Sequence, residues 1–404
     1  MTHVVSTDIT SDQFEKDQYV VFLTRDMDFG IDDEHPAPQL EGVWGPLSAK
    51  FDPDLITRLA TFAKHFTLDL PSNTMWGDIY PTHAPLLEVL DSGDLEEAHN
   101  HLQVMHSSPL MDGISQGYDQ ARRLVNNPKA IELRLLRIWD TLLSVSEYTG
   151  VLGIQNQEQG PTPLRISIET LVNALPENIV APPWQANLLC LKTPRGLFSE
   201  RDLISLYIAL QISLKIPVGS RILEIGGGAG YTAYWLYLMG YQNIYMLDIP
   251  TVSIAQAYQL AANIGAENIS FSHENKQSAV TFITADDLKT LGKVDVVLNC
   301  DSMPEMTLEW AHTYLDFISK NSRYFYSINQ ETATKYIKPQ VDINSGIGRG
   351  DPSIPEEHRQ HVVWKLIHKN YPNLYRMERY KFWMRDGYTE EWYGNIPQNG
   401  ENSS

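Results

Sequence analysis

A run of glycines beside a single acid, between residues 224 and 230, has the residue types and spacing for cofactor chemistry. Glu224 is followed by Gly226, Gly227, Gly228 and Gly230. Glycine lets the backbone approach a ligand closely and adopt positive φ values that other residues avoid. A carboxylate at the same place attracts a positively charged ligand and repels an anionic one. The segment therefore predicts a binding turn for a ligand that carries positive charge.

The elements expected around this turn are a strand before it and a helix after it. Residues 221–223 form a short apolar run typical of a buried strand. Residues 231–239 are aromatic-rich and helical in pattern, starting at Tyr231 and ending before Gly240. A strand, a glycine turn and a helix in this order wrap a nucleotide-like ligand.

Two cofactors bind to such turns, and the acid distinguishes them. The dinucleotide fingerprint G-x-G-x-x-G/A can be placed on Gly228, Gly230 and Ala233, but it leaves Glu224 unexplained. A dinucleotide presents an anionic pyrophosphate, which prefers bare N–H groups at a helix start. S-adenosylmethionine carries a sulfonium and an ammonium group. Glu224 therefore favours S-adenosylmethionine, while an NAD-dependent oxidoreductase and a cofactor-free binding module stay as alternatives.

A second acid follows the next expected strand. Asp248 ends a strand-like run over residues 242–248 and can accept hydrogen bonds from both ribose hydroxyls of a nucleoside. Ile249 follows it and offers an apolar contact for adenine. Ligands of open parallel sheets bind outside the carboxyl ends of the strands, so these residues are expected beside the glycine turn.

Polar residues follow two further expected strands in the same way. Asp286 and Asp287 come after the strand 280–283 and either meet the adenine amino group or cap a helix. Asn299 ends the strand 294–299. The residues predicted to bind the cofactor are Glu224, Gly226, Gly227, Gly228, Gly230, Tyr231, Asp248, Ile249, Asp286, Asp287 and Asn299.

The register Glu224-x-Gly226-x-Gly228-x-Gly230 resembles motif I of the class I S-adenosylmethionine-dependent methyltransferases. With Asp248-Ile249-Pro250 and the segments 301–306 and 383–393, the chain resembles the sugar O-methyltransferase family of bacterial polysaccharide and natural-product clusters. The resemblance covers residues 221–393. It implies a Rossmann-like α/β fold with a mostly parallel seven-stranded sheet, a C-terminal antiparallel hairpin and a mainly helical region before it. It also implies an S-adenosylmethionine-dependent O-methyltransferase that acts on a sugar hydroxyl.

A sugar hydroxyl needs a positioned general base, because its own pKa is high. In methyltransferases of this class the loop after the fourth strand faces the methyl group, which makes Asp301, Glu305 and His312 the candidate catalytic residues. His358 and His361 are held in reserve. Each has a structural alternative, because Asp301 could cap a helix, Glu305 could be a first-turn acid and His312 could pack in a helix. A methyltransferase of nitrogen or carbon would need no such base and stays as an alternative.

Composition limits the partners. The formal charge is −19, from 31 basic and 50 acidic residues, without a basic run, so a nucleic-acid partner is not expected. The absence of long apolar stretches and of a signal pattern predicts no membrane partner. Two cysteines, Cys190 and Cys300, are too few for a disulfide framework, so a cytoplasmic protein is expected. The expected partner is a small-molecule substrate, a sugar or glycoside, and a homo-oligomer is allowed for.

Metal binding is not predicted. His99, His101 and His106 lie in a polar stretch and are expected on a solvated face rather than in a zinc site. Two nearby carboxylates at residues 301 and 305 could hold a divalent cation that lowers the pKa of the acceptor, but this is not favoured.

Three regions are expected along the chain. Residues 1–190 form a mainly helical region for the substrate or for oligomerisation, residues 195–395 form the methyltransferase domain, and residues 396–404 form a disordered tail. The irregular segment 339–355 is long enough to be a substrate lid. Aromatic residues are expected to line a sugar pocket; they are Trp76, Tyr80, Tyr118, Tyr336, Trp364, Trp383, Tyr388 and Trp392.

Overall fold

The computed structural model describes residues 39–46, 49–66, 80–111, 114, 115, 120, 124, 126–148, 166–185, 187–330, 361–382, 384 and 387–395. Their contacts divide the chain into two compact units. Among the described residues, the first unit takes 39–46 and 106–204, and the second takes those within 49–105, 205–330 and 361–395.

The first unit contains a small antiparallel sheet of order β1–β2–β3 and two helices that contact β2. At its end helix α9 begins, and there the carboxylate of Asp202 accepts hydrogen bonds from the backbone N–H and the hydroxyl of Ser199. The elements are β1 (Gly42–Trp44), α7 (Pro128–Tyr148), α8 (Ile168–Ala174), β2 (Leu189–Thr193), β3 (Gly196–Phe198) and α9 (Glu200–Lys215), which continues into the second unit.

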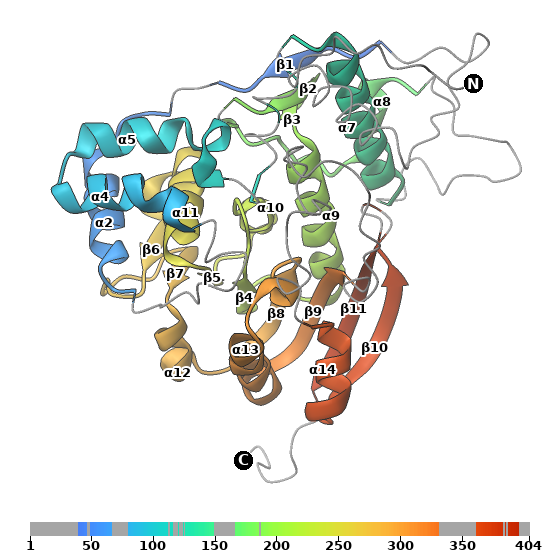
Figure 1. The fold of residues 1–404 in the computed structure, drawn as a ribbon. Helices are drawn as coiled ribbons and strands as arrows, with labels where there is room; N and C mark the ends of the chain where they lie inside the picture. Colours follow the sequence, from blue (N-terminus) through green and yellow to red (C-terminus); the bar gives the residue numbers. More distant parts are fainter. Residues whose placement is uncertain are drawn as a thin grey trace, which may run out of the picture. The chain divides into compact units, whose positions relative to one another are not determined.

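The second unit is built on an eight-stranded sheet of order β10–β11–β9–β8–β4–β5–β7–β6 (Figure 1). The pairs from β9 to β6 are parallel, whereas β11 is antiparallel to both β9 and β10. The strands are β4 (Ile222–Ile225), β5 (Ile244–Leu247), β6 (Ile269–Phe271), β7 (Val280–Ile283), β8 (Val294–Cys300), β9 (Ser322–Gln330), β10 (Leu374–Lys381) and β11 (Tyr388–Asn395).

This arrangement confirms the predicted fold class, a Rossmann-like α/β fold with a mostly parallel sheet and an antiparallel C-terminal hairpin. The sheet has one strand more than the seven expected. The extra strand is β6, which pairs in parallel with β7 at the edge of the sheet. It has three residues, too few for a strand period to show in the sequence.

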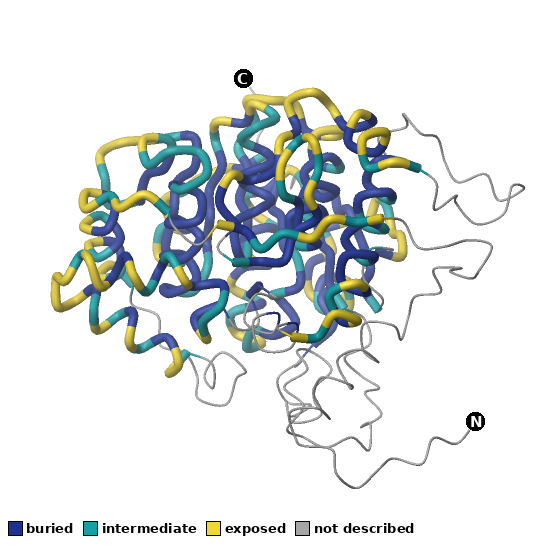
Figure 2. Tube along the Cα trace, turned by 90° about the horizontal axis from the view of Figure 1, so that it is seen from above, coloured by how far each residue is buried: buried dark blue, intermediate teal, exposed yellow. Residues whose placement is uncertain are grey.

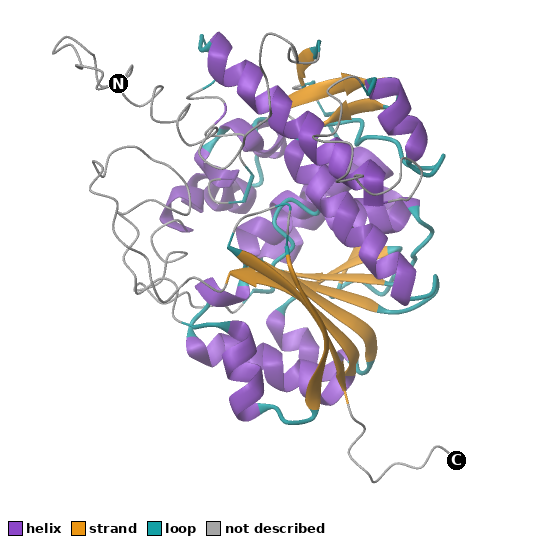
Figure 3. Ribbon diagram, turned by 90° about the vertical axis from the view of Figure 1, so that its right-hand side faces the viewer, coloured by secondary structure: helices purple, strands orange, loops and turns teal. Residues whose placement is uncertain are grey.

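Helices cover both faces of this sheet (Figure 3). On one face, α12, α13 and α14 bury Leu288, Leu315 and Ile367 against strand residues such as Leu223 and Val297. The strands β4, β5 and β7 are buried at every position, within the interior that is dark blue in Figure 2. The helices are α2 (Pro53–Ala63), α4 (Ala84–Ser92), α5 (Leu95–Gln103), α10 (Tyr231–Leu238), α11 (Pro250–Ile264), α12 (Leu288–Leu291), α13 (Leu308–Asn321) and α14 (Val363–Asn370).

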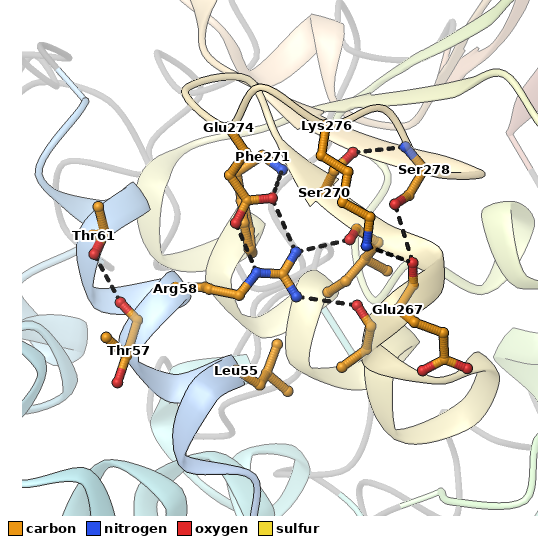
Figure 4. Close-up of polar contacts among 12 residues, drawn as sticks. Leu55, Thr57, Arg58, Thr61, Glu267, Ser270, Phe271, Glu274, Lys276 and Ser278 are labelled. Carbon is orange, nitrogen blue, oxygen red and sulfur yellow. Dashed lines mark hydrogen bonds and ion pairs between the residues drawn. The ribbon is translucent and has the colours of Figure 1, made fainter.

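Helix α2 is joined to the edge of the sheet by Arg58 (Figure 4). The guanidinium donates two hydrogen bonds to the carboxylate of Glu274, at 2.7 and 3.0 Å. It also donates to the carbonyl oxygen of Ile269 in β6 at 2.8 Å and to that of Ala266 at 3.1 Å. Arg58 thus satisfies acceptors at an edge that would otherwise be open to pairing. The segment 49–105 accordingly belongs to the same compact unit as the sheet.

The expected solvated face at His99, His101 and His106 is wrong for two of the three. His99 is buried, and its Nδ1 lies 2.9 Å from the hydroxyl of Tyr258. His106 is buried as well, with Nδ1 3.0 Å from the hydroxyl of Ser115. Tyr258 is 159 residues from His99 and Ser115 is nine residues from His106, so neither contact is visible in the polar stretch itself.

Several predictions fall outside the described residues. They concern the lid 339–355, the tail 396–404, His358, Trp76, Tyr118, Tyr336 and Trp383. Within the described ranges, no helix combines the length and the apolar character that a membrane span requires.

Candidate cofactor and acceptor site

The glycine turn joins the end of β4 to the start of α10. Gly226, Gly228 and Gly230 have φ values of 71°, 59° and 79°, in the left-handed region that favours glycine. The N–H of Gly226 donates to the carbonyl of Leu247 at 2.8 Å, which holds the ends of β4 and β5 together. Tyr231, the first residue of α10, is buried.

Close packing leaves the turn no room for side chains. A Cβ atom on Gly226 would lie 2.0 Å from the Oγ of Ser302, and one on Gly227 would lie 2.8 Å from the Cδ of Glu224. Real Cβ atoms essentially never show contacts this short. A side chain would therefore force a shift, which is costlier at Gly226, where the short Ser302 side chain is hydrogen-bonded, than at Gly227, where the ends of Glu224 and Met246 can move.

Glu224, in β4, has a buried carboxyl group directly under the turn. Burial raises its pKa to about 8; a hydrogen bond with Thr232 opposes the rise and the charge of Asp248 adds to it. Among the described residues, its buried Oε2 atom has no hydrogen-bond partner. A buried acceptor without a donor is costly, so this oxygen is poised to accept a donor from a ligand.

Asp248 follows β5, and its carboxylate accepts more hydrogen bonds from the protein itself than the sequence predicts. It accepts hydrogen bonds from the N–H of Ile249 at 2.8 Å and from the amide of Gln256 at 2.7 Å. Burial raises its pKa to about 7, against these bonds and against hydrogen bonds from the N–H groups of Gly228 and Gly227. A carboxylate offers about four lone-pair sites. A ribose hydroxyl would therefore have to share or displace one of these donors.

The two acids after β7 have different surroundings. The carboxylate of Asp287 accepts from the N–H of Thr284 at 2.7 Å and from its hydroxyl at 3.0 Å, in a capping box. Asp286 is largely exposed and forms an ion pair with Lys289 at 2.8 Å. Asp287 thus fits the helix-capping alternative: its side chain closes the capping box of the 3-10 turn Ala285–Asp287, whose N-cap is Thr284, and the residue is itself the N-cap of α12.

Asn299 at the end of β8 belongs to a polar network that joins three strand ends. Its amide nitrogen donates to the carbonyl of Ile225 at 2.9 Å and to the hydroxyl of Ser302 at 2.6 Å. Its oxygen accepts from the amide of Asn329, at the end of β9, at 2.9 Å. Because Asn299 is fully buried and bonded on both sides, it positions Ser302 against the glycine turn.

Asp301 lies in the turn after β8 with φ of 64°, a left-handed conformation that Asp and Asn tolerate better than most residues. It is buried, and its Oδ1 accepts a hydrogen bond from the hydroxyl of Tyr388 at 2.5 Å. Its N–H donates to the carbonyl of Ile328 at 2.8 Å. Asp301 does not cap a helix, because Ser302 is the N-cap of the next turn.

The other candidate bases lie beyond Asp301 in the same unit. Glu305 is buried in the short 3-10 turn Met303–Glu305. His312, in α13, has its Nδ1 2.8 Å from the hydroxyl of Tyr371. His361, just before α14, is buried with its Nε2 2.8 Å from the carbonyl oxygen of Met303. The fold therefore brings Glu305 and His361 to one short turn, through Met303.

The aromatic and acidic side chains of the last strand, β11, are buried in the core and do not form an exposed aromatic surface. Glu390 is buried and accepts from the hydroxyls of Tyr207 at 2.8 Å and Tyr326 at 2.9 Å. Trp392 is 1% exposed and stacks on Tyr326 at 4.2 Å between ring centroids. Trp392 is thus a core residue and not a wall of the expected sugar pocket.

Sequence reasoning missed Ser302, Gln256 and the pairing of Tyr388 with Asp301. Ser302 and Gln256 act on the predicted residues Gly226 and Asp248, but single polar residues in a loop or helix give no local signal. Among the residues that the structure describes, no group of three or more His, Cys, Asp and Glu side chains could hold a metal ion.

Comparison with protein-family models gives no match for this chain, and comparison with curated proteins gives none either. Solved structures that are similar include three methyltransferases. The magnesium protoporphyrin IX methyltransferase of Synechocystis PCC 6803 with bound SAH is 15% identical, with 49% of this chain and 84% of that chain covered and a TM-score of 0.34. A SAM-dependent methyltransferase of Aquifex aeolicus is 15% identical, with 48% and 89% covered and a TM-score of 0.32. An O-methyltransferase family protein of Burkholderia thailandensis is 13% identical, with 49% and 60% covered and a TM-score of 0.33. At these TM-scores, the fold class rests on the strand order and register of the sheet itself.

Proposed function

We propose that this protein is an S-adenosylmethionine-dependent O-methyltransferase that acts on a hydroxyl of a sugar-containing acceptor. The acceptor class comprises a glycoside, a nucleotide sugar or a glycosylated natural product. The observation that carries the proposal is the buried carboxyl of Glu224 under a side-chain-free glycine turn, with one oxygen lacking a donor among the described residues.

The residues at this turn suit the cofactor. Glu224 would accept from its ammonium group and offset its positive charge, and Asp248 with Ile249 would meet the nucleoside. The N–H groups of the turn would approach closely because no Cβ atoms intervene. When bound, S-adenosylmethionine supplies an electrophilic methyl carbon. A buried carboxyl group under the turn, that of Glu224, is a poor partner for a pyrophosphate, which prefers bare N–H groups, and this is why an NAD-dependent enzyme is the weaker alternative.

The acceptor side of the proposal rests on the two segments that resemble the sugar O-methyltransferases. These segments, 301–306 and 383–393, are far apart in sequence, yet Asp301 and Tyr388 are in direct hydrogen-bond contact. Their contact lies after β8, at the carboxyl end of the parallel strands, where the glycine turn after β4 also lies. A base in this region would take the proton of the hydroxyl while the protein orients the oxygen toward the methyl group. A methyltransferase of nitrogen or carbon would keep the cofactor site and dispense with the base.

Calorimetry with S-adenosylmethionine, its demethylated product S-adenosylhomocysteine and NAD tests the cofactor. We expect micromolar binding of the first two and none of NAD. Mass spectrometry with methyl-labelled cofactor and a panel of nucleotide sugars and glycosides then tests the acceptor. Tight NAD binding without a signal for S-adenosylmethionine would overturn the proposal, and labelled nitrogen or carbon products would replace the hydroxyl acceptor.

A further inference from the structure

His361 is held in a single orientation by a backbone acceptor. Its Nε2 lies 2.8 Å from the carbonyl oxygen of Met303. A carbonyl oxygen only accepts, so Nε2 must carry the proton in this hydrogen bond. In the neutral imidazole the second nitrogen, Nδ1, then carries the lone pair.

The anchor of this imidazole is part of the segment that contacts the glycine turn. Met303 follows Ser302, and the Ser302 hydroxyl lies 3.3 Å from the carbonyl of Ile225, against the α-carbon of Gly226. Asn299 fixes the same hydroxyl at 2.6 Å. His361 is therefore linked to the proposed cofactor turn through Met303, which it bonds, and through Ser302, which contacts the turn.

The Nδ1 atom of His361 is buried and, within the described residues, has no hydrogen-bond partner. Burial lowers the pKa of His361, the bond to Met303 opposes this, and the nearby His312 lowers it further. The ring is therefore neutral at pH 7, and none of the described residues uses the lone pair on its Nδ1. Two of the other predicted bases are more committed, since Asp301 accepts a hydrogen bond from Tyr388 and His312 forms one with Tyr371.

The geometry points to Nδ1 of His361 as the general base that takes the proton from the acceptor hydroxyl, an inference that rests on the proposed function. As the acceptor oxygen gains the methyl group, its proton moves to Nδ1. The electron pair of the broken carbon–sulfur bond stays on sulfur, which becomes a neutral thioether. The positive charge passes to the imidazolium, whose Nε2–H remains bonded to Met303.

The decisive variant is His361→Gln. A glutamine amide can keep the hydrogen bond to the Met303 carbonyl but has no counterpart of the Nδ1 lone pair. We expect kcat for methyl transfer to fall by about 10²–10⁴-fold, while S-adenosylhomocysteine binds as before. The matched control is His368→Gln, at an exposed histidine in the last turn of α14, which should leave kcat unchanged. Equal turnover by wild type and His361→Gln would overturn the assignment.

Two further readouts separate a base from a structural residue. The wild-type kcat should fall at acid pH with a midpoint below 6.5, the ordinary value for histidine, and His361→Gln should lose this limb. Nitrogen-15 NMR of the labelled imidazole at pH 8 should show a protonated Nε2 and an unprotonated Nδ1; the opposite tautomer would refute the inference. If wild-type protein binds S-adenosylhomocysteine but methylates no hydroxyl of the panel, the proposed function fails and the assignment falls with it.

Discussion

The hydroxyl of Tyr388 donates a 2.5 Å hydrogen bond to Oδ1 of Asp301, and so ties the first residue of β11 to the turn after β8. Both side chains are buried. Asp301 has a left-handed conformation and lies at the carboxyl end of the parallel strands, where the glycine turn also lies. An antiparallel strand added to a parallel sheet thus fixes the geometry of the proposed site.

The Tyr388–Asp301 bond should stabilise the fold measurably. We expect Tyr388→Phe to lower the free energy of unfolding by about 1.5–3 kcal/mol, as for buried hydrogen bonds to charged groups. Asp301→Gly removes the acceptor and keeps a residue that tolerates the left-handed φ, so the double variant isolates the bond itself. Urea unfolding of all four proteins measures the coupling. Exposed Tyr375→Phe serves as the control, and strictly additive losses would contradict the bond.

Cofactor binding should release protons at pH 7. Glu224 has a pKa of about 8 and is mostly protonated in the free protein at this pH. A bound cation favours the carboxylate, so S-adenosylmethionine should expel up to roughly one proton and bind more tightly as pH rises from 6 to 8. Calorimetry in buffers of different ionisation enthalpy measures the release. Glu224→Gln should abolish it; an undiminished release in that variant would point to another group.

Without ligand, the same acids should destabilise the protein as pH rises. The folded pKa values, about 8 for Glu224 and about 7 for Asp248, lie above the ordinary 4.5 and 3.8. The folded state therefore binds protons more tightly than the unfolded state, and their contribution to stability is lost between the ordinary and the raised values. Glu224→Gln should melt higher than wild type at pH 8.5 and alike at pH 4. Exposed Glu88→Gln is the control, and an equal difference at both pH values would count against the buried charge.

Substitution of Gly226 by alanine should destabilise the protein more than the same substitution at Gly219, another glycine with positive φ. Gly219 has φ of 100° and open space around its α-carbon, whereas a side chain on Gly226 meets Ser302. We expect Gly219→Ala to cost about 1–2 kcal/mol of stability, the price of the left-handed conformation alone. Gly226→Ala should cost more and weaken S-adenosylhomocysteine binding by on the order of 10²-fold, about 2.8 kcal/mol. Similar affinities in the two variants would show that the clash is relieved locally.

Arg58 should stabilise the edge strand β6 through the several hydrogen bonds of its planar guanidinium group as well as through its charge. Arg58→Lys keeps the charge but cannot serve the Glu274 carboxylate and two carbonyls together. The side chains are 25% and 19% exposed, so solvent screening limits the expected loss to about 1 kcal/mol. Thermal unfolding at low and high salt measures it. Lys129→Ala, which removes an exposed ion pair with Glu132, should have no effect.

The sequence predicts most where the candidate site residues lie on the same strand–turn–helix segments that form the sheet. Glu224, the glycines and Asp248 lie on consecutive strand–turn–helix units, so their spacing predicts both the sheet and the juxtaposition of the two acids. The predicted strand Val280–Ile283 agrees with the structure to the residue, because β-branched and aromatic residues favour strands.

The sequence was least informative where the partner is remote. The burial of His99 depends on Tyr258, which is 159 residues away, and the orientation of His361 depends on Met303, which is 58 residues away. No periodicity encodes such pairs. The hydrogen bond from Gln256 to Asp248 depends on how helix α11 packs beside the end of β5. Residue types alone do not determine this packing.

The assignment of residues between 49 and 105 to the sheet unit gives the chain an interleaved connectivity. The polypeptide contributes to one compact unit, then the other, then the first again, before it enters the large sheet at β4. A fragment that starts near residue 195 would therefore lose Arg58 and helices α2, α4 and α5 from its own unit. A single cut would therefore not release the sheet unit intact, and the two units should be expressed as one chain.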